Sequence, residues 1–194
     1  MPLISPAPSR LRYWQCRLRL LLWLVTARHA RALAVLGTML RLRPDDMYSL
    51  ASRSHLLAQL GRPDDAIADA LAVTRTHTPC AAVHWFNLGY LMERAGDLGA
   101  AEHAFRRSAA LDPKLDRTWY GLGLVLIRLH RFDAAIEALK RNVDLQPLSP
   151  YGWYQLARVH GLRNEFDEVR RIIQHLKGFE RKVAAQLERE TGSA

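Results

Sequence analysis

The sequence predicts an all-α protein, an α-solenoid built from repeated helix-turn-helix hairpins. Three tryptophans, Trp85, Trp119 and Trp153, are spaced by 34 residues. A fixed period of about 20 to 50 residues is typical of repeat proteins. Within each period, apolar residues recur three and four positions apart, as they do on the buried face of a helix. In the repeat that starts at Ala82, Gly96-Asp97 and Asp112-Pro113 each interrupt the pattern, so the repeat holds two helices.

Further columns of residues keep step with the tryptophans. They are Leu88, Leu122 and Leu156; Gly89, Gly123 and Ala157; Leu98, Phe132 and Phe166; Ala101, Ala135 and Val169; and Phe105, Leu139 and Ile173. The small residues in the Gly89 and Ala101 columns predict a close approach of the two helices in each hairpin. The large residues in the Trp85 and Phe105 columns fill the space around that contact.

These residues resemble the tetratricopeptide repeat. The clearest copy is Trp85, Leu88, Gly89, Met92, Ala101, Phe105, Ser108 and Pro113. A second copy starts at Trp119 and ends at Pro147, and a third starts at Trp153 but lacks the closing proline. The resemblance covers about residues 26–177 and implies a right-handed solenoid of tetratricopeptide-type hairpins with a C-terminal capping helix.

The chain divides into seven predicted segments. They are a flexible N-terminus over 1–12, an Arg-rich helical segment or degenerate repeat over 13–46, a weak first repeat over 47–81, three further repeats over 82–115, 116–149 and 150–178, and a capping helix and tail over 179–194. In the last segment, Phe179, Val183 and Leu187 recur every four residues, and charged residues occupy the opposite side. Such a helix covers the exposed edge of the last repeat.

The net charge of +9 belongs to the front of the chain, because residues 1–43 contain eight arginines and no acid. We consider three interpretations of this segment. In the first, a degenerate repeat packs its apolar side, including Leu18, Leu21, Leu22 and Val25, on the next hairpin, with the arginines in solvent. In the second, an amphipathic helix lies on an anionic membrane surface through Arg10, Arg12, Arg17 and Arg19. In the third, which we disfavour, the segment binds nucleic-acid phosphates, although the chain has no nucleic-acid-binding motif.

Composition excludes several protein classes. With 49% hydrophobic and 24% charged residues, the chain is expected to fold around a core. Two cysteines cannot form a disulfide framework and fit a reducing compartment. No apolar run is long enough to cross a membrane, and the residues after Val25 fit a signal-peptide cleavage site poorly. We expect a cytoplasmic protein, with peripheral contact to a membrane as the alternative.

The sequence contains no recognisable catalytic motif: the patterns of serine hydrolases, P-loop enzymes and zinc proteases are missing. We therefore predict that the protein is not an enzyme, with no catalytic residue, no cofactor and no small-molecule substrate. Gly121 and Gly123 resemble the start of a dinucleotide loop, but we interpret them as a helix-packing pair. His77, Cys80 and His84 have metal-ligand side chains, but they lack a matched second pair of ligands, so we expect no metal site.

The resemblance implies that one side of each first helix lines a concave groove that binds a protein or peptide. The predicted groove residues are Phe86, Tyr90, Arg94, Arg117, Tyr120, Leu124, Ile127, Arg128, Tyr151, Tyr154 and Arg158. Tyrosine and arginine are enriched at the energetic centres of protein interfaces. The alternative is that these aromatic residues form only the partly buried lining of the array.

A subset of the tetratricopeptide family grips C-terminal carboxylates with lysine and asparagine. The corresponding positions here hold Phe86, Tyr90, Tyr120 and Leu124, so that clamp is missing. We expect instead a partner segment with apolar anchors and one or two acids. The predicted function is a non-catalytic scaffold, adaptor or assembly chaperone. The alternative is a module that acts on a membrane surface or nucleic acid through the Arg-rich front segment, and the prediction leaves homo-oligomerisation open.

Overall fold

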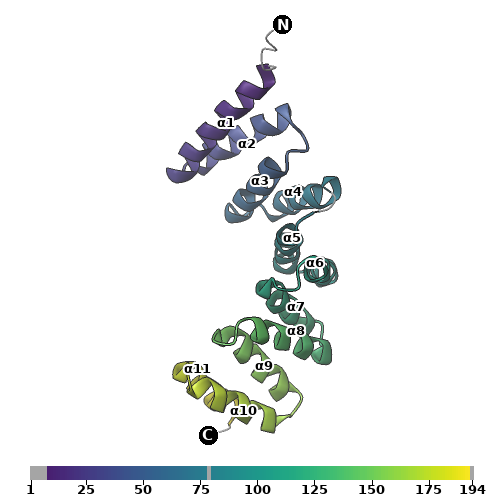
Figure 1. Ribbon diagram of the computed structural model, residues 1–194, viewed down its shortest axis with the longest axis vertical. Helices are drawn as coiled ribbons and strands as arrows, with labels where there is room; N and C mark the ends of the chain where they lie inside the picture. The colour runs from purple at the N-terminus through teal and green to yellow at the C-terminus, as the bar shows by residue number, and fades with distance from the viewer. Residues whose placement is uncertain (1–7, 78–79, 193–194) are drawn as a thin grey trace, which may run out of the picture. The chain divides into compact units, whose positions relative to one another are not determined.

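The computed structural model describes residues 8–77 and 80–192, and every regular element in these ranges is a helix (Figure 1). The helices are α1 (Pro8–Val25), α2 (His29–Leu42), α3 (Met47–Gln59), α4 (Pro63–Thr76), α5 (Ala82–Ala95), α6 (Leu98–Leu111), α7 (Asp116–Arg128), α8 (Phe132–Leu145), α9 (Pro150–Leu162), α10 (Phe166–Lys177) and α11 (Arg181–Thr191). The all-α prediction is confirmed. The chain forms two compact units, Met1–Cys80 and Ala81–Ala194.

In the first unit, α1 pairs with α2, α3 pairs with α4, and α2 packs on α3. The first helix begins at Pro8, a favourable residue for a first helical position because its missing N–H needs no partner there. Residues 8–12 are therefore helical, although the sequence predicted a flexible terminus over 1–12; residues 1–7 of that segment lie outside the described residues.

The side of α1 that packs on α2 differs from the side expected from the sequence. Tyr13, Cys16 and Leu20 are buried and join the α2 core residues in one hydrophobic cluster. Leu18 and Leu22, which the first interpretation placed in the core, are exposed. The correction has a simple cause. Apolar residues surround most of this helix, so periodicity alone does not identify which apolar side meets its neighbour.

Hydrogen bonds of the Asp46 side chain link α1 to the N-terminus of α3. Its carboxylate accepts hydrogen bonds from the Tyr13 hydroxyl over 2.8 Å and from the backbone N–H of Ser49 over 2.9 Å. Asp46 is thus the N-cap of α3. Burial raises the pKa of Asp46, but the hydrogen bonds from Ser49 and Tyr13 outweigh burial and lower the pKa below its ordinary value.

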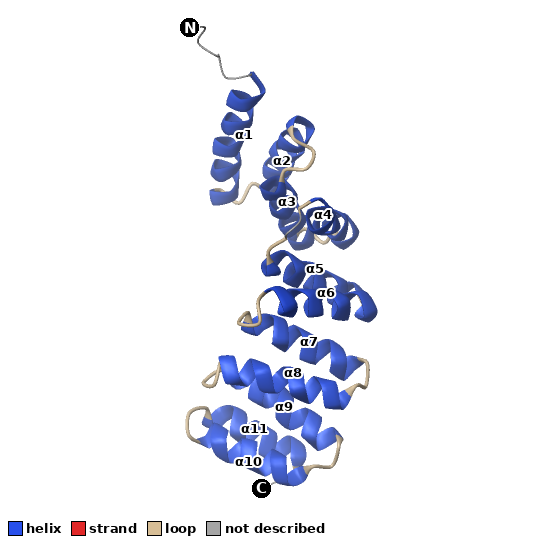
Figure 2. Ribbon diagram, turned by 45° about the vertical axis from the view of Figure 1, so that its right-hand side comes forward, coloured by secondary structure: helices blue, strands red, loops and turns tan. Residues whose placement is uncertain are grey.

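The second unit is a stack of three hairpins, α5–α6, α7–α8 and α9–α10, in which each hairpin packs on the next (Figure 2). Phe105 of α6 is almost fully buried where α5 and α7 meet it. A Cβ atom would lie 2.9 Å from its ring at Gly89 and 2.7 Å from its ring at Gly121. Both glycines are therefore required for close helix packing, and the helix-packing interpretation of Gly121 is confirmed.

The tryptophan and proline columns are linked by a recurring hydrogen bond. The indole N–H of Trp119 donates to the carbonyl of Pro113 over 2.8 Å, and Trp153 donates to Pro147 over 2.8 Å. Each tryptophan is partly buried against the core of its unit. The bond anchors the start of one repeat to the residue that closes the previous repeat.

The last helix, α11, packs on α9 and α10 and caps the second unit. Ala184 and Leu187 are buried, while Arg181, Lys182 and Arg189 point to solvent. Residues 193 and 194 of the predicted tail lie outside the described residues. None of the described helices is long and apolar enough to cross a membrane.

Candidate peptide-binding surface of the second unit

The first helices of the three hairpins in the second unit lie next to one another. Helix α7 contacts α5 on one side and α9 on the other, whereas the described part of the unit shows no comparable contact between α6 and α8 or between α8 and α10. The stack is therefore tighter along α5, α7 and α9. We call the exposed side of these three helices the inner face. All eleven predicted groove residues belong to these helices.

Two tyrosines on the inner face are each followed four residues later by an arginine that lies over the ring. The guanidinium of Arg94 is 5.8 Å from the ring centroid of Tyr90 and donates a hydrogen bond to its hydroxyl over 3.3 Å. The guanidinium of Arg158 is likewise 5.8 Å from the ring of Tyr154. Residues four apart are neighbours on a helix, so each pair forms within a single helix.

A third aromatic–arginine pair joins two helices. The guanidinium of Arg117, at the start of α7, lies 4.9 Å from the ring centroid of Phe86 on α5. The ring of Phe86 also packs on Phe105, with 5.9 Å between the ring centroids. Arg117 is exposed, so its charge lies at the surface of the inner face beside an aromatic ring.

Arg128 is engaged within the protein. It forms an ion pair with the carboxylate of Glu93 and donates to the Glu93 backbone carbonyl over 3.2 Å. Because Glu93 lies on α5 and Arg128 on α7, this contact fastens two neighbouring repeats. The sequence predicted Arg128 as a groove residue; in the structure its charge is already neutralised.

Tyr154 is attached to the capping helix. Its hydroxyl lies 2.9 Å from Oε2 of Glu190 and donates to that carboxylate, and Gln186 donates to the Tyr154 hydroxyl over 3.3 Å. Burial, followed by the hydrogen bond to Glu190, raises the pKa of Tyr154. Sequence reasoning missed Gln186 and Glu190 as neighbours of the inner face. Their spacing of four on the polar side of α11 was the available indication.

The remaining predicted groove residues differ in accessibility. Tyr120 and Ile127 are partly buried and pack on the core of the second unit. Leu124 is also partly buried, whereas Tyr151 is 70% exposed at the start of α9. The inner face therefore combines apolar surface along α7 with accessible aromatic and cationic groups at its edges.

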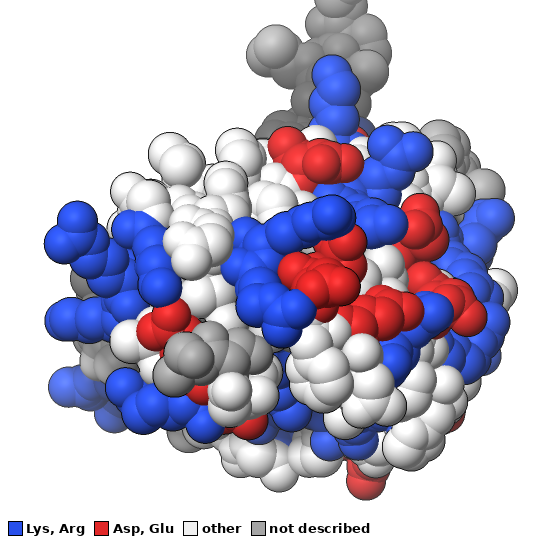
Figure 3. All heavy atoms as spheres, turned by 90° about the horizontal axis from the view of Figure 1, so that it is seen from below, with Lys and Arg blue, Asp and Glu red and all other residues white. Residues whose placement is uncertain are grey.

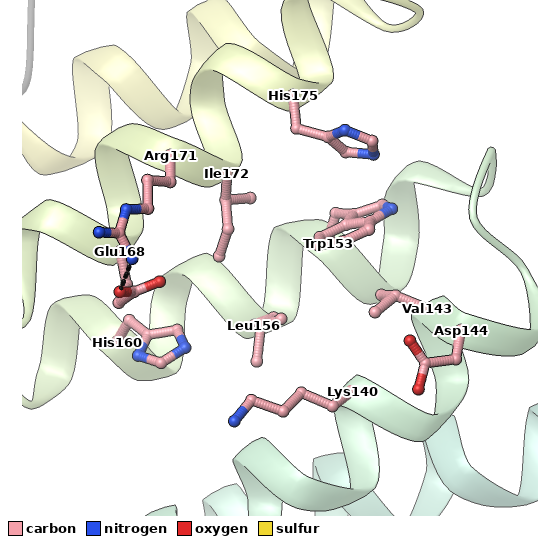
Figure 4. A pocket seen from close by; sticks show the side chains of 10 residues that line it. All are labelled: Lys140, Val143, Asp144, Trp153, Leu156, His160, Glu168, Arg171, Ile172 and His175. Atoms are coloured by element: carbon pink, nitrogen blue, oxygen red, sulfur yellow. Dashed lines mark hydrogen bonds and ion pairs between the residues drawn. The ribbon is translucent and has the colours of Figure 1, made fainter.

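Two cavities of the second unit lie away from the inner face. One, of about 380 Å³, lies between α8, α9 and α10 beside Trp153, His160 and His175 (Figure 4). Charges of both signs line it, and its Glu168 and Arg171 are ion-paired. The other, of about 640 Å³, is lined by residues of α6, α7 and α8. Neither of these two cavities includes a predicted groove residue.

The possible metal ligands have other surroundings. The His77 ring lies 2.6 Å from the backbone carbonyl of Asp45, and burial raises the pKa of the Cys80 thiol. His84 belongs to the second unit, and Pro79 lies outside the described residues. Among the described residues, no group of three or more His, Cys, Asp or Glu side chains is placed to hold a metal ion.

A family model described as tetratricopeptide repeat matches residues 52–116 and 120–168. No curated protein sequence matches the chain. Among solved structures, MamA from Desulfovibrio magneticus RS-1 is similar with a TM-score of 0.76 and 20% identity, over 92% of this chain and 96% of that chain.

Two other solved structures are similarly close in fold. A tetratricopeptide repeat protein from Parabacteroides merdae ATCC 43184 gives a TM-score of 0.81 at 16% identity, over 94% of this chain and 74% of that chain. YrrB, described as a protein of this family with an unusual peptide-binding site, gives 0.77 at 12% identity, over 88% of both chains. At such identities, similarity of structure establishes the fold alone. The sequence match covers more than half of the chain, and the chain therefore belongs to the tetratricopeptide repeat family.

Proposed function

We propose that this protein is a non-catalytic scaffold, of the adaptor or assembly-chaperone kind, whose inner face binds an extended segment of a partner protein. Protein–protein interaction is the general role of its fold family. One observation carries the specific proposal: three aromatic–arginine pairs lie along α5, α7 and α9. Such pairs offer apolar area and charged donors at the same place, which is the chemistry of interface centres.

The charges on this face indicate the chemistry of the partner. Within the described part of the chain, Arg94 and Arg117 form no ion pair with an acid. Arg158 differs: hydrogen bonds from Gln186 and Tyr154 lower the pKa of Glu190, and the nearby charge of Arg158 lowers it further. A guanidinium binds a carboxylate through two parallel hydrogen bonds. Because Arg94 and Arg117 have no acidic partner within the described part of the protein, they favour an acidic segment.

The aromatic rings define the rest of the partner. Tyr90 is 46% exposed beside Arg94, and Phe86 lies beneath Arg117. An apolar side chain placed on either ring would bury area while a nearby acid contacts the arginine. The positions of the family's carboxylate clamp hold aromatic and aliphatic residues here. An internal segment with one or two acids and apolar anchors therefore fits better than a free C-terminus.

The proposal is tested by replacing the two unpaired arginines together, Arg94→Glu with Arg117→Glu, and identifying the proteins captured from a lysate by affinity purification and mass spectrometry. The matched control is Arg107→Glu with Arg141→Glu, which changes the charge equally on exposed residues of α6 and α8. Captured proteins should be lost from the first variant and retained by the control. Equal capture by both variants would contradict the proposal.

A defined probe complements the lysate experiment. A fluorescent peptide derived from the region of a captured partner that is protected from proteolysis should bind the wild-type chain and the control. Replacing its acids by lysine should weaken binding by at least about tenfold, because each buried charged pair contributes on the order of 2 kcal/mol or more. Binding that is insensitive to those acids would show that the arginines do not recognise the partner.

A further inference from the structure

Helix α1 has two apolar sides, and only one of them is covered. Tyr13, Cys16 and Leu20 pack on α2. The opposite side exposes a row of large apolar residues, with Leu18 at 69% and Val25 at 86% exposure. We call this row the outer stripe. It consists of Leu11, Trp14, Leu18, Leu21, Leu22 and Val25.

The outer stripe is continuous along the helix. Leu11, Leu18 and Val25 are seven residues apart, and Trp14 and Leu21 lie three residues after the first two. With 3.6 residues per turn, all of these side chains fall within about 100° of the helix circumference. Soluble proteins seldom leave a contiguous apolar surface of this kind uncovered, so the stripe indicates a binding surface.

Arginines lie on both sides of the stripe. At about 100° per residue, Arg12 and Arg19 fall on one flank and Arg10 and Arg17 on the other. Arg17 lies 4.0 Å from the ring centroid of Tyr48, so it packs against the protein, unlike the other three. Arg10, Arg12 and Arg19 are exposed. The sequence interpretation that grouped Arg17 with these three as surface cations therefore needs this refinement.

The outer face of α11, the last described helix, is exposed to solvent and offers a comparison with the outer stripe of α1. The outward residues of α11 include Arg181, Lys182 and Arg189, with a Lys177–Glu188 ion pair beside them. Seen from the end where α10 and α11 lie, basic and acidic side chains are interspersed (Figure 3). A capping helix of a repeat array ordinarily has such a polar outer face. The outer stripe of α1 departs from this rule.

From this arrangement we propose that the outer stripe of α1 lies on an anionic lipid bilayer surface. The apolar side chains enter the boundary between headgroups and acyl chains, while Arg10, Arg12 and Arg19 reach lipid phosphates on either side. Trp14 suits the headgroup level because its ring is apolar and its N–H is polar. The helix lies along the surface, since its arginines exclude a spanning orientation.

Charge argues against a second copy as the occupant. Residues 1–43 have eight arginines and no acid, so two copies of this segment would bring like charges together. An anionic bilayer satisfies both the apolar side chains and the arginines.

The experiment is vesicle co-sedimentation of the full chain with phosphatidylglycerol–phosphatidylcholine vesicles and with phosphatidylcholine alone. Wild-type protein should bind the anionic vesicles, and added salt should weaken binding. Arg12→Gln with Arg19→Gln should weaken partitioning by roughly 30-fold, since each arginine near an anionic surface contributes about fivefold. Leu18→Gln with Leu22→Gln should weaken it by at least about tenfold.

Two controls separate a membrane surface from other occupants. Leu148→Gln, at an exposed leucine of the second unit, should leave vesicle binding unchanged. Analytical ultracentrifugation reports whether the outer stripe holds two copies together. A wild-type dimer that Leu18→Gln with Leu22→Gln converts to monomer, without lipid binding, would overturn the proposal. So would equal binding to neutral and anionic vesicles, or binding to a DNA or RNA duplex that the leucine replacements do not affect.

Discussion

The hydroxyl of Tyr154 on α9 donates a hydrogen bond to Glu190 on α11 over 2.9 Å. Gln186 donates to the same carboxylate over 2.8 Å and to the Tyr154 hydroxyl over 3.3 Å. These hydrogen bonds lower the pKa of Glu190 below its ordinary value. Its carboxylate therefore stays ionised at pH values at which an ordinary glutamate begins to take up a proton. The capping helix is thus fastened to the last aromatic residue of the inner face.

Tyr154→Phe should loosen the capping helix. Removing the hydroxyl leaves Glu190 with Gln186 alone, so amide hydrogen exchange should become faster in α11 while α5 to α8 stay unchanged. The loss of overall stability should stay below about 1.5 kcal/mol, the usual contribution of one hydrogen bond. Tyr151→Phe is the matched control, because Tyr151 is mostly exposed. Unchanged exchange in α11 would show that apolar packing alone holds the helix.

The sequence predicted the repeats because each hairpin repeats one packing solution. The columns at Gly89 and Phe105 mark a helix–helix contact that recurs between Gly123 and Leu139 in the next hairpin, so periodicity alone located it. The Tyr154–Glu190 bond and the Arg128–Glu93 ion pair occur once and join separate helices. No periodic pattern marks such contacts. The same reason explains why the buried side of α1 was predicted wrongly. This helix has two apolar sides, and only its packing on α2, which no periodic pattern marks, determines which side is buried.

Gly121→Ala should destabilise the second unit. Its added Cβ would lie 2.7 Å from Cζ of Phe105, whose ring is almost fully buried. Overpacking of this kind costs about 1–3 kcal/mol. Gly161→Ala is the control, since an added Cβ there would meet no atom within 4 Å beyond its chain neighbours and its own helix backbone, and alanine favours a helix. Urea unfolding followed by circular dichroism measures the unfolding midpoint of each variant. A Gly121→Ala midpoint equal to that of Gly161→Ala would contradict the packing role of Gly121.

Asp46→Ala should destabilise the first unit in a pH-dependent way. The replacement removes the N-cap of α3 and the acceptor for Tyr13, and caps of this kind contribute about 1–2 kcal/mol. Because the pKa of Asp46 is lowered on folding, its contribution is complete above the unfolded pKa of about 3.9. The contribution is lost as the pH falls through the lower pKa of the folded state.

Urea unfolding of wild type and Asp46→Ala at pH 7, 5 and 3 checks this dependence. The gap between the two proteins should be equal at pH 7 and 5 and should shrink at pH 3 and below. Asp45→Ala provides a neighbouring control, because Asp45 is exposed and its described contact to His77 uses the backbone carbonyl. A gap that is constant from pH 7 to below pH 3 would show that the carboxylate charge of Asp46 contributes nothing.

Arg53→Met should strongly destabilise the first unit. Nε and Nη2 of Arg53 donate to the two carboxylate oxygens of Asp69, each over 2.6 Å, and the Asp69 side chain is only 8% exposed. Without Arg53, a nearly buried carboxylate loses its charged partner, which costs about 3 kcal/mol. Arg53→Met with Asp69→Leu should recover most of that loss, because the buried charge is removed as well. Arg62→Met, at the exposed pair with Asp65, should change unfolding by under about 0.5 kcal/mol. If the double variant is no more stable than Arg53→Met alone, packing by the arginine stem, and not pairing of the buried charge, accounts for the loss.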